Sequence, residues 1–239
     1  MKRMIITLMM TNFFFSCRSN IEGEGVATAQ SEYQIEQFSN LTVDCNCDVT
    51  LIPSELPNVV VESHQNIIDN LEVTSKRKDL IIKEKSGVSN TDLYNINVYV
   101  NQDLTKIKLT NHAKLRISGT LKLNDLQIEL KDLSTISEAN VDLKRLEMRM
   151  SGLSRIEMKG TAINLMLHAS GESEADLFSL QTVDTDFRAE DESQLLLYAM
   201  KGLTGTATDN AKVNYKGDPV KKTTERDRAI IEQKFLDNE

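Results

Sequence analysis

The chain has 239 residues, of which 40% are hydrophobic and 5% aromatic, and its formal net charge is −8. The apolar fraction is large enough to build a sizeable core, which excludes a disordered chain. The acidic balance argues against a general nucleic-acid binder, because such a protein needs basic groups to displace counterions from phosphates. Scarce aromatic residues and plentiful branched aliphatic residues favour thin, regular β layers.

The N-terminal segment 1–17, "MKRMIITLMMTNFFFSC", predicts a secretory signal. Two basic residues precede an apolar run that is too short to span a bilayer. The small Ser16 before Cys17 is typical of a bacterial lipoprotein signal, in which the cysteine becomes the acylated first residue. The alternative is an ordinary cleaved signal with Cys17 as an incidental thiol.

Residues 18–32 are polar and contain glycine without an apolar period, so they predict a flexible tether. The folded domain is expected over 33–220. Its first part, 33–100, contains irregularly spaced β runs and one helical turn in "HQNIIDNL". These runs predict either wider coils or a β cap that protects the first regular coil.

Two cysteines, Cys45 and Cys47, are separated by one residue. On a strand both side chains would leave the same face, with Cα atoms near the upper limit for a disulfide. A disulfide, metal binding and redox chemistry are alternatives, but the second pair of ligands that a zinc site needs is absent from the motif. We expect two buried thiols.

The region 101–220 contains a repeat with a period near 20 residues, which is typical of a solenoid. The copies are "LTNHAKLRI" from Leu109, "LKDLSTISE" from Leu130, "MSGLSRIEM" from Met150, "ASGESEADL" from Ala169, "AEDESQLLL" from Ala189 and "ATDNAKVNY" from Ala207.

Each position of the repeat has a physical character. The first and seventh positions are apolar, and apolar residues also recur at alternate positions before the first, as on a strand with one face buried. The third position is always a residue that tolerates a tight turn. These residues are Asn111, Asp132, Gly152, Gly171, Asp191 and Asp209. The fifth position is small throughout. These residues are Ala113, Ser134, Ser154, Ser173, Ser193 and Ala211.

Stacked copies would pair equivalent strands in parallel and align the apolar positions into one core. The sequence therefore predicts an all-β, right-handed parallel β-solenoid, since parallel crossovers prefer that hand. An antiparallel sandwich is the structural alternative. The charged tail 221–239 predicts a short amphipathic helix, with Thr224 as a cap and Ala229, Ile230 and Phe235 as its apolar strip.

Candidate sites for chemistry are few. His64, His112 and His168 share neither a repeat position nor a pair spacing, so they predict no metal or acid–base site. Acidic turn residues could suggest calcium, but Gly152 and Gly171 interrupt that series, so no metal site is expected.

Carboxylates cluster on two adjacent coils, where Arg188 is the nearby guanidinium. These carboxylates are Glu172, Glu174, Asp176, Glu190, Asp191 and Glu192. Sugar-cleaving solenoids combine such groups with basic residues and aromatics in a groove, and no aromatic stripe is present here. We therefore expect solvated acidic coils, no catalytic residue and no cofactor.

Three stretches carry a resemblance to a known family: "FSNLTVDCNCDVTLI", the coils with "MSGLSRIEM" and "ASGESEADL", and the ending "VNYKGDP". With these the chain resembles the bacterial head GIN domain family of adhesin-like proteins, which is frequent among secreted lipoproteins of the Bacteroidetes. The resemblance covers roughly 33–220 and implies no catalytic residues.

We therefore expect a non-catalytic cell-envelope lipoprotein with a binding or scaffolding surface. A carbohydrate-active β-helix enzyme and an envelope sensing module are the alternatives. The expected partners are the membrane, through a lipid on Cys17, and a glycan or an envelope protein, with no nucleic acid. The expected location is extracytoplasmic, on the outer membrane, at its periplasmic side or at the cell surface.

Overall fold

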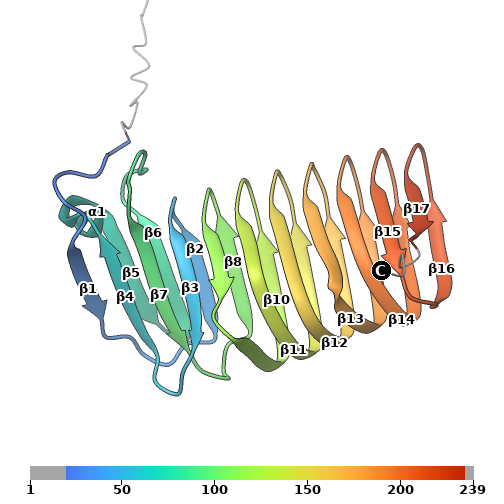
Figure 1. Cartoon of the computed structure of the whole chain (residues 1–239), viewed down its shortest axis with the longest axis horizontal. Helices are drawn as coiled ribbons and strands as arrows, with labels where there is room; N and C mark the ends of the chain where they lie inside the picture. The colour runs from blue at the N-terminus through green and yellow to red at the C-terminus, as the bar shows by residue number, and fades with distance from the viewer. Residues whose placement is uncertain (1–19, 235–239) are drawn as a thin grey trace, which may run out of the picture.

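The computed structural model describes residues 20–234 and shows a parallel β-solenoid of stacked coils (Figure 1). The regular coils are built by β8 (Lys106–Thr110), β9 (Lys114–Ile117), β10 (Thr120–Leu130), β11 (Thr135–Met150), β12 (Arg155–Ala169), β13 (Glu174–Ala189), β14 (Gln194–Ala207), β15 (Lys212–Lys216), β16 (Val220–Glu225) and β17 (Ile230–Gln233). The N-terminal part is built by β1 (Ala29–Tyr33), β2 (Asn40–Asp44), β3 (Asp48–Pro53), β4 (Asn58–Ser63), α1 (Gln65–Asn70), β5 (Leu71–Lys76), β6 (Asp79–Glu84) and β7 (Tyr94–Val100).

The register of the coils matches the predicted repeat. The first position pairs in parallel through all six copies, from Leu109 to Leu130, Met150, Ala169, Ala189 and Ala207. The seventh position does the same from Leu115 to Val213. The predicted parallel solenoid is therefore confirmed, and the antiparallel sandwich is excluded for these coils.

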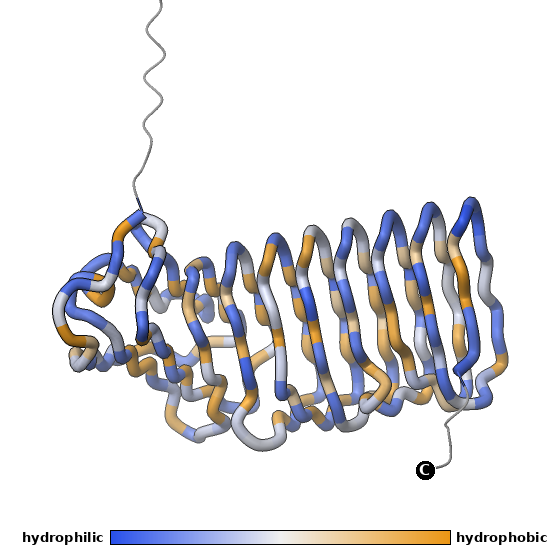
Figure 2. Tube along the Cα trace, turned by 45° about the horizontal axis from the view of Figure 1, so that its top comes forward, coloured by the Kyte–Doolittle hydropathy of each residue, from blue (hydrophilic) through white to orange (hydrophobic). Residues whose placement is uncertain are grey.

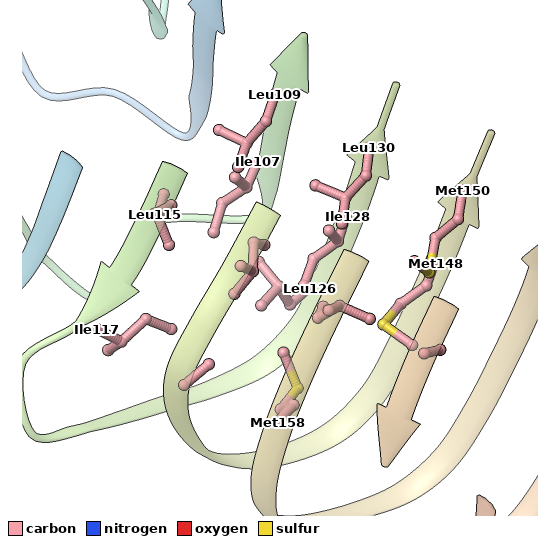
Figure 3. Packing of buried hydrophobic residues seen from close by; sticks show 14 of the residues in the cluster. Ile107, Leu109, Leu115, Ile117, Leu126, Ile128, Leu130, Met148, Met150 and Met158 are labelled. Atoms are coloured by element: carbon pink, nitrogen blue, oxygen red, sulfur yellow. The ribbon is translucent and has the colours of Figure 1, made fainter. Parts of the chain in front are cut away.

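The core lies inside the coils, where the aligned apolar side chains stack (Figure 3). Ile128, Leu130, Met148 and Met150 are nearly fully buried and point into this interior. Burying each such side chain contributes about 1.5–3 kcal/mol. Apolar and polar residues alternate along each coil (Figure 2), so the strands that bury their apolar side chains present the polar ones to the outside.

A tight corner separates the two paired sides of each coil. All six predicted turn residues have positive φ angles, from 60° at Asn111 to 74° at Gly152. The small fifth position lies just inside this corner, and the four serines there have no exposed surface. The predicted corner and its crowded inner side are thus confirmed.

The N-terminal part contains both of the predicted arrangements. Strands β2 and β3 form a coil that stacks in parallel on β8 and β9. On the other side of this coil, β6 pairs in parallel with β2, and β7 with β3. Beyond them, β4 runs antiparallel to β7, β1 antiparallel to β4, and β5 antiparallel to β6. These antiparallel strands and α1 lie at the N-terminal end of the solenoid (Figure 1).

Part of the predicted tether belongs to the fold. Ile21 forms a parallel bridge with Val88, and the carbonyl of Glu22 accepts a hydrogen bond from the Asn66 side chain at 2.7 Å. Residues 29–32 lie in β1. The prediction of a flexible tether is therefore wrong from residue 20 onward, because backbone hydrogen bonds hold a segment that has no apolar period.

Cys45 and Cys47 form a disulfide, so the expectation of two free thiols is wrong. Val43 pairs with Leu109 and Val49 with Leu115, which places both cysteines at the tight corner of their coil. The corner shortens their Cα separation to 5.4 Å, well within the range for a disulfide. Both side chains are buried, as expected.

The C-terminal tail forms one more coil instead of the predicted helix. β16 pairs in parallel with β14, and β17 with β15, while Asp227 takes the corner position with φ 60°. In this last coil the inward positions that are apolar elsewhere carry Lys221, Thr223 and Glu225. This loss of alternating hydrophobicity hid the strand in the sequence. Phe235 lies outside the described residues.

Candidate functional site

The acidic corner residues hold neighbouring coils together. The carboxylate of Asp132 accepts a hydrogen bond from the backbone N–H of Asn111 at 3.1 Å, and that of Asp191 accepts one from Gly171 at 2.8 Å. Asp209 does the same for the N–H of Asp191 at 3.4 Å. These carboxylates are therefore engaged in the architecture of the corner.

Two histidines make hydrogen bonds to carboxylates. His64 is buried, and its Nε2 lies 2.6 Å from a carboxylate oxygen of Asp92, which lowers the pKa of Asp92. His168 lies 2.8 Å from Glu190 on the outer face of the solenoid. Among residues 20–234, no group of three or more histidine, cysteine or acidic side chains is placed to hold a metal ion.

Arg188 does not complete the acidic site that a carbohydrate-active enzyme would need. Its guanidinium forms an ion pair with Glu190 at 2.5 Å. The carboxylate of Asp191 instead accepts a hydrogen bond from the backbone N–H of Gly171, and Glu172, beside Gly171, is exposed. The pKa of Glu190 is held below its usual value by the hydrogen bond from His168 and by Arg188. Of the six carboxylates predicted to cluster, Glu174 pairs with Arg155 at 3.1 Å and Glu190 pairs with Arg188 and His168, while Glu172 and Glu192 are exposed.

Cys17 lies outside the described residues, so its acylation stays a prediction. No helix within residues 20–234 is both long and apolar enough to cross a membrane.

A second bend of the coil forms a feature that the sequence reasoning missed. Here two successive residues face outward, as at Ile163 and Asn164, between the buried Ala162 and Leu165. Stacking aligns these bends, because Leu143 pairs with Ala162, and Ala162 with Thr182. The break in strict alternation, repeated once per coil, is the sequence signal that could have revealed it.

Along this bend runs a hollow of about 560 Å³, which we call the bend groove. Its lining residues are Gln102, Lys122, Leu123, Asn124, Asp142, Leu143, Lys144, Thr161, Ala162, Ile163, Gln181, Val183 and Met200. Ile163 and Met200 are 47% and 48% exposed, with the half-buried Val183 between them. A hollow of about 600 Å³, which shares Lys122 and Leu123, continues it towards Pro53.

The bend groove combines an apolar row with charged side chains. The apolar row Ile163, Val183 and Met200 crosses three consecutive coils, and Lys122 and Lys144 flank it. Such a surface can cover an extended apolar or amphipathic partner, and Asp142, the register partner of Lys122, offsets part of the positive charge of the two lysines. Among its lining residues, the hydroxyl of Thr161 donates a hydrogen bond to the carboxylate of Asp142 at 3.1 Å.

Several solved structures share this fold. A "putative adhesin" from Bacteroides fragilis is 16% identical, with a TM-score of 0.83 over 90% of this chain and 100% of that one. A "putative lipid binding protein" from Parabacteroides distasonis is 18% identical, with a TM-score of 0.75 over 91% and 100% of the chains. A "putative adhesin" from Parabacteroides merdae is 15% identical, with a TM-score of 0.69 over 90% and 99%.

No curated protein is significantly similar to the chain. A family model described as "Putative auto-transporter adhesin, head GIN domain" matches residues 37–219, which include the CNC corner, the regular coils and the ending "VNYKGDP". The chain therefore belongs to the head GIN domain family.

Proposed function

We propose that the chain is a non-catalytic lipoprotein of the cell envelope whose solenoid acts as an adhesin-like binding or scaffolding surface. The observation that carries this proposal is the bend groove, where exposed apolar side chains align across consecutive coils. Exposed apolar side chains that line a hollow are typical of a binding site. The names of the structural neighbours and of the family support an adhesive role.

The partner we propose is an envelope protein or a glycan-bearing surface. A repeated fold presents the same kind of contact once per coil, so an extended partner could span several coils. The ion-paired outer wall around Glu190 would contribute little to affinity, because exposed ion pairs are worth less than about 1 kcal/mol. We therefore assign the binding to the groove.

Adhesion of whole cells tests this role. Cells that display the full chain are allowed to settle on surfaces coated with a mucin glycoprotein, and the bound cells are counted. The double variant Ile163→Ser/Met200→Ser should reduce adhesion to the level of cells without the chain. The control Leu133→Ser/Leu153→Ser changes two residues of similar exposure at the tight corners and should adhere normally. Equal adhesion by both variants would contradict the groove as the binding surface.

Anchoring at the membrane is the second half of the proposal. The basic start, the short apolar run and the Ser16–Cys17 pair support acylation of Cys17 and an extracytoplasmic location on the outer membrane. Radiolabelled palmitate should label the wild-type chain, and this label should be absent from Cys17→Ala. Label that persists in this variant would disprove the anchor. In a separate experiment, protease treatment of intact cells would report which membrane face carries the domain.

A second candidate function is the binding of an amphiphile in the same groove. The apolar row beside Lys144 matches an apolar tail with an acidic headgroup, and one structural neighbour is named a "putative lipid binding protein". A fluorescent fatty acid should then gain fluorescence with the full chain and lose that gain with Ile163→Ser/Met200→Ser. An unchanged signal in the variant would exclude this candidate.

A further inference from the structure

The C-terminal end of the solenoid is formed by β16 and β17 (Figure 1). Within residues 20–234, β16 pairs with β14 alone and β17 with β15 alone. Each strand therefore has one edge whose backbone groups have no strand partner. Open edges can pair with another chain, so proteins either protect them or use them.

The backbone of β16 shows which groups are free. The N–H of Arg226 donates to the carbonyl of Ala207 in β14, at 3.0 Å. Because the backbone groups of successive strand residues point to opposite sides, Lys222 and Thr224 also face β14. The N–H and C=O groups of Lys221, Thr223 and Glu225 consequently point away from the solenoid, along its axis.

The same three residues carry a self-complementary pattern of charge. Their side chains continue the inward positions of Leu203, Gly205 and Ala207 in the preceding coil. An antiparallel copy of β16, with Thr223 opposite its own equivalent, would place Lys221 opposite Glu225 of the second copy, and Glu225 opposite Lys221. Opposite charges and paired threonines are both favourable across antiparallel strands.

We propose that the chain forms a two-fold symmetric dimer through antiparallel pairing of β16 with β16 of a second copy, in the register centred on Thr223. The pairing satisfies the free backbone groups of Lys221, Thr223 and Glu225 in both chains. The two-fold axis reverses the direction of the solenoid, so two solenoids join end to end, with their N-terminal ends outermost.

A head-to-tail filament is a poorer solution for the same edge. Continuing the stack would place Lys221 and Glu225 against another coil without a matched charge, at the positions where a solenoid core is apolar. The N-terminal end carries α1 and the strands β1 and β5, each antiparallel to its partner, so it does not end in a regular parallel coil. In the single chain, Lys221 instead lies over the ring of Tyr215, 5.4 Å from its centroid.

Charge reversal tests the register of the dimer. The full chain, purified in mild detergent, is analysed by sedimentation across a concentration series. Lys221→Glu alone and Glu225→Lys alone should each raise the dimer dissociation constant by at least about tenfold, because like charges then face each other twice. An equimolar mixture of these two variants should restore the dimer, as should the double variant Lys221→Glu/Glu225→Lys.

A chemical cross-link provides a second measurement. Thr223→Cys should form a covalent dimer with a short bismaleimide. Thr204→Cys lies one coil further in, on β14, and should not form one. In the proposed dimer three strand spacings of about 4.8 Å would separate this residue from its equivalent in the second chain. A wild-type chain that stays monomeric, a filament, or a mixture of the charge variants that fails to associate would overturn the proposal. In the monomeric case Lys221 and Glu225 would serve only to protect the edge.

Discussion

The carboxylate of Asp191 accepts a hydrogen bond from the backbone N–H of Gly171, the residue at the same corner position one coil earlier, at 2.8 Å. Both residues have a left-handed backbone, with φ 61° at Asp191 and φ 70° at Gly171. Aspartate at this position thus does two things: it tolerates the turn and it ties two coils together. Glycine meets only the first requirement.

Substitutions at Asp191 should separate these two contributions. Asp191→Gly loses the hydrogen bond and should cost about 1 kcal/mol of unfolding free energy. Asp191→Ala also forces a Cβ-bearing residue without a local hydrogen bond into the left-handed region, and should cost about 2 kcal/mol. Denaturant titration measures both variants. Asp186→Ala, on the exposed face of β13, should change stability by less than about 0.5 kcal/mol. Equal losses for glycine and alanine would contradict the role of backbone strain.

Gly160 should be far less tolerant of a side chain than Gly119. Both have positive φ angles, 115° and 85°. A Cβ on Gly160 would collide with the carbonyl of Val141 in the neighbouring coil, whereas a Cβ on Gly119 would meet nothing within 4 Å. Gly160→Ala should therefore cost more than about 2 kcal/mol, because backbone atoms of the stack must move. Gly119→Ala should cost about 1 kcal/mol, from backbone strain alone. Thermal unfolding that ranks the two variants the other way would refute this.

The corner was predictable from sequence because few residues tolerate a positive φ. Asn111, Asp132 and Gly152 differ in chemistry but share that tolerance, so the period survives large sequence variation. The small inner position was predictable for a similar steric reason. Both signals are local, and each is repeated in every coil.

The parts that escaped prediction depend on context that a local pattern does not carry. The coil containing Val43 stacks on that containing Leu109, although the cap strands separate them in sequence, so no short period links them. The β16 side of the last coil carries Lys221, Thr223 and Glu225 at its inward positions, so the alternating apolar pattern is absent there. The bend groove depends on pairs of outward residues that align between coils. Ile163 is one of these exposed residues, and the repeat does not require an apolar residue at its position.

The buried serines at the inner side of the corner should differ in their contribution to stability. The hydroxyl of Ser134 donates to the carbonyl of Leu109 at 3.3 Å and accepts from the N–H of Lys131 at 3.1 Å. The hydroxyl of Ser173 is equally buried but has no hydrogen-bond partner among the described residues. Ser134→Ala should thus cost about 1 kcal/mol, while Ser173→Ala should be neutral or stabilising. A loss for Ser173→Ala as large as that for Ser134→Ala, measured by denaturant titration, would reveal a partner for that hydroxyl.

Glu129 should make the stability of the solenoid depend on pH in the acidic range. Its carboxylate lies 2.9 Å from Lys131, and within 4 Å of both Lys106 and Lys108. The hydrogen bond from Lys131 and the charges of the other two lysines hold the pKa of Glu129 below its usual value of 4.5. A lowered pKa in the folded state means that the stabilisation is complete above the unfolded pKa and is lost as pH falls through the folded pKa.

Glu129→Gln should therefore lower the unfolding free energy at pH 7, by no more than about 1 kcal/mol because the cluster is partly exposed. The difference between wild type and variant should shrink as pH falls below 4, since the wild-type carboxylate then loses its charge. Glu192→Gln, at an exposed corner, serves as the control and should change the unfolding free energy at pH 7 by less than about 0.5 kcal/mol. High salt should also reduce the effect at pH 7, because it screens partly exposed charges. A difference for Glu129→Gln that stays constant from pH 7 to pH 3 would mean that packing of the side chain, rather than its charge, stabilises the coil.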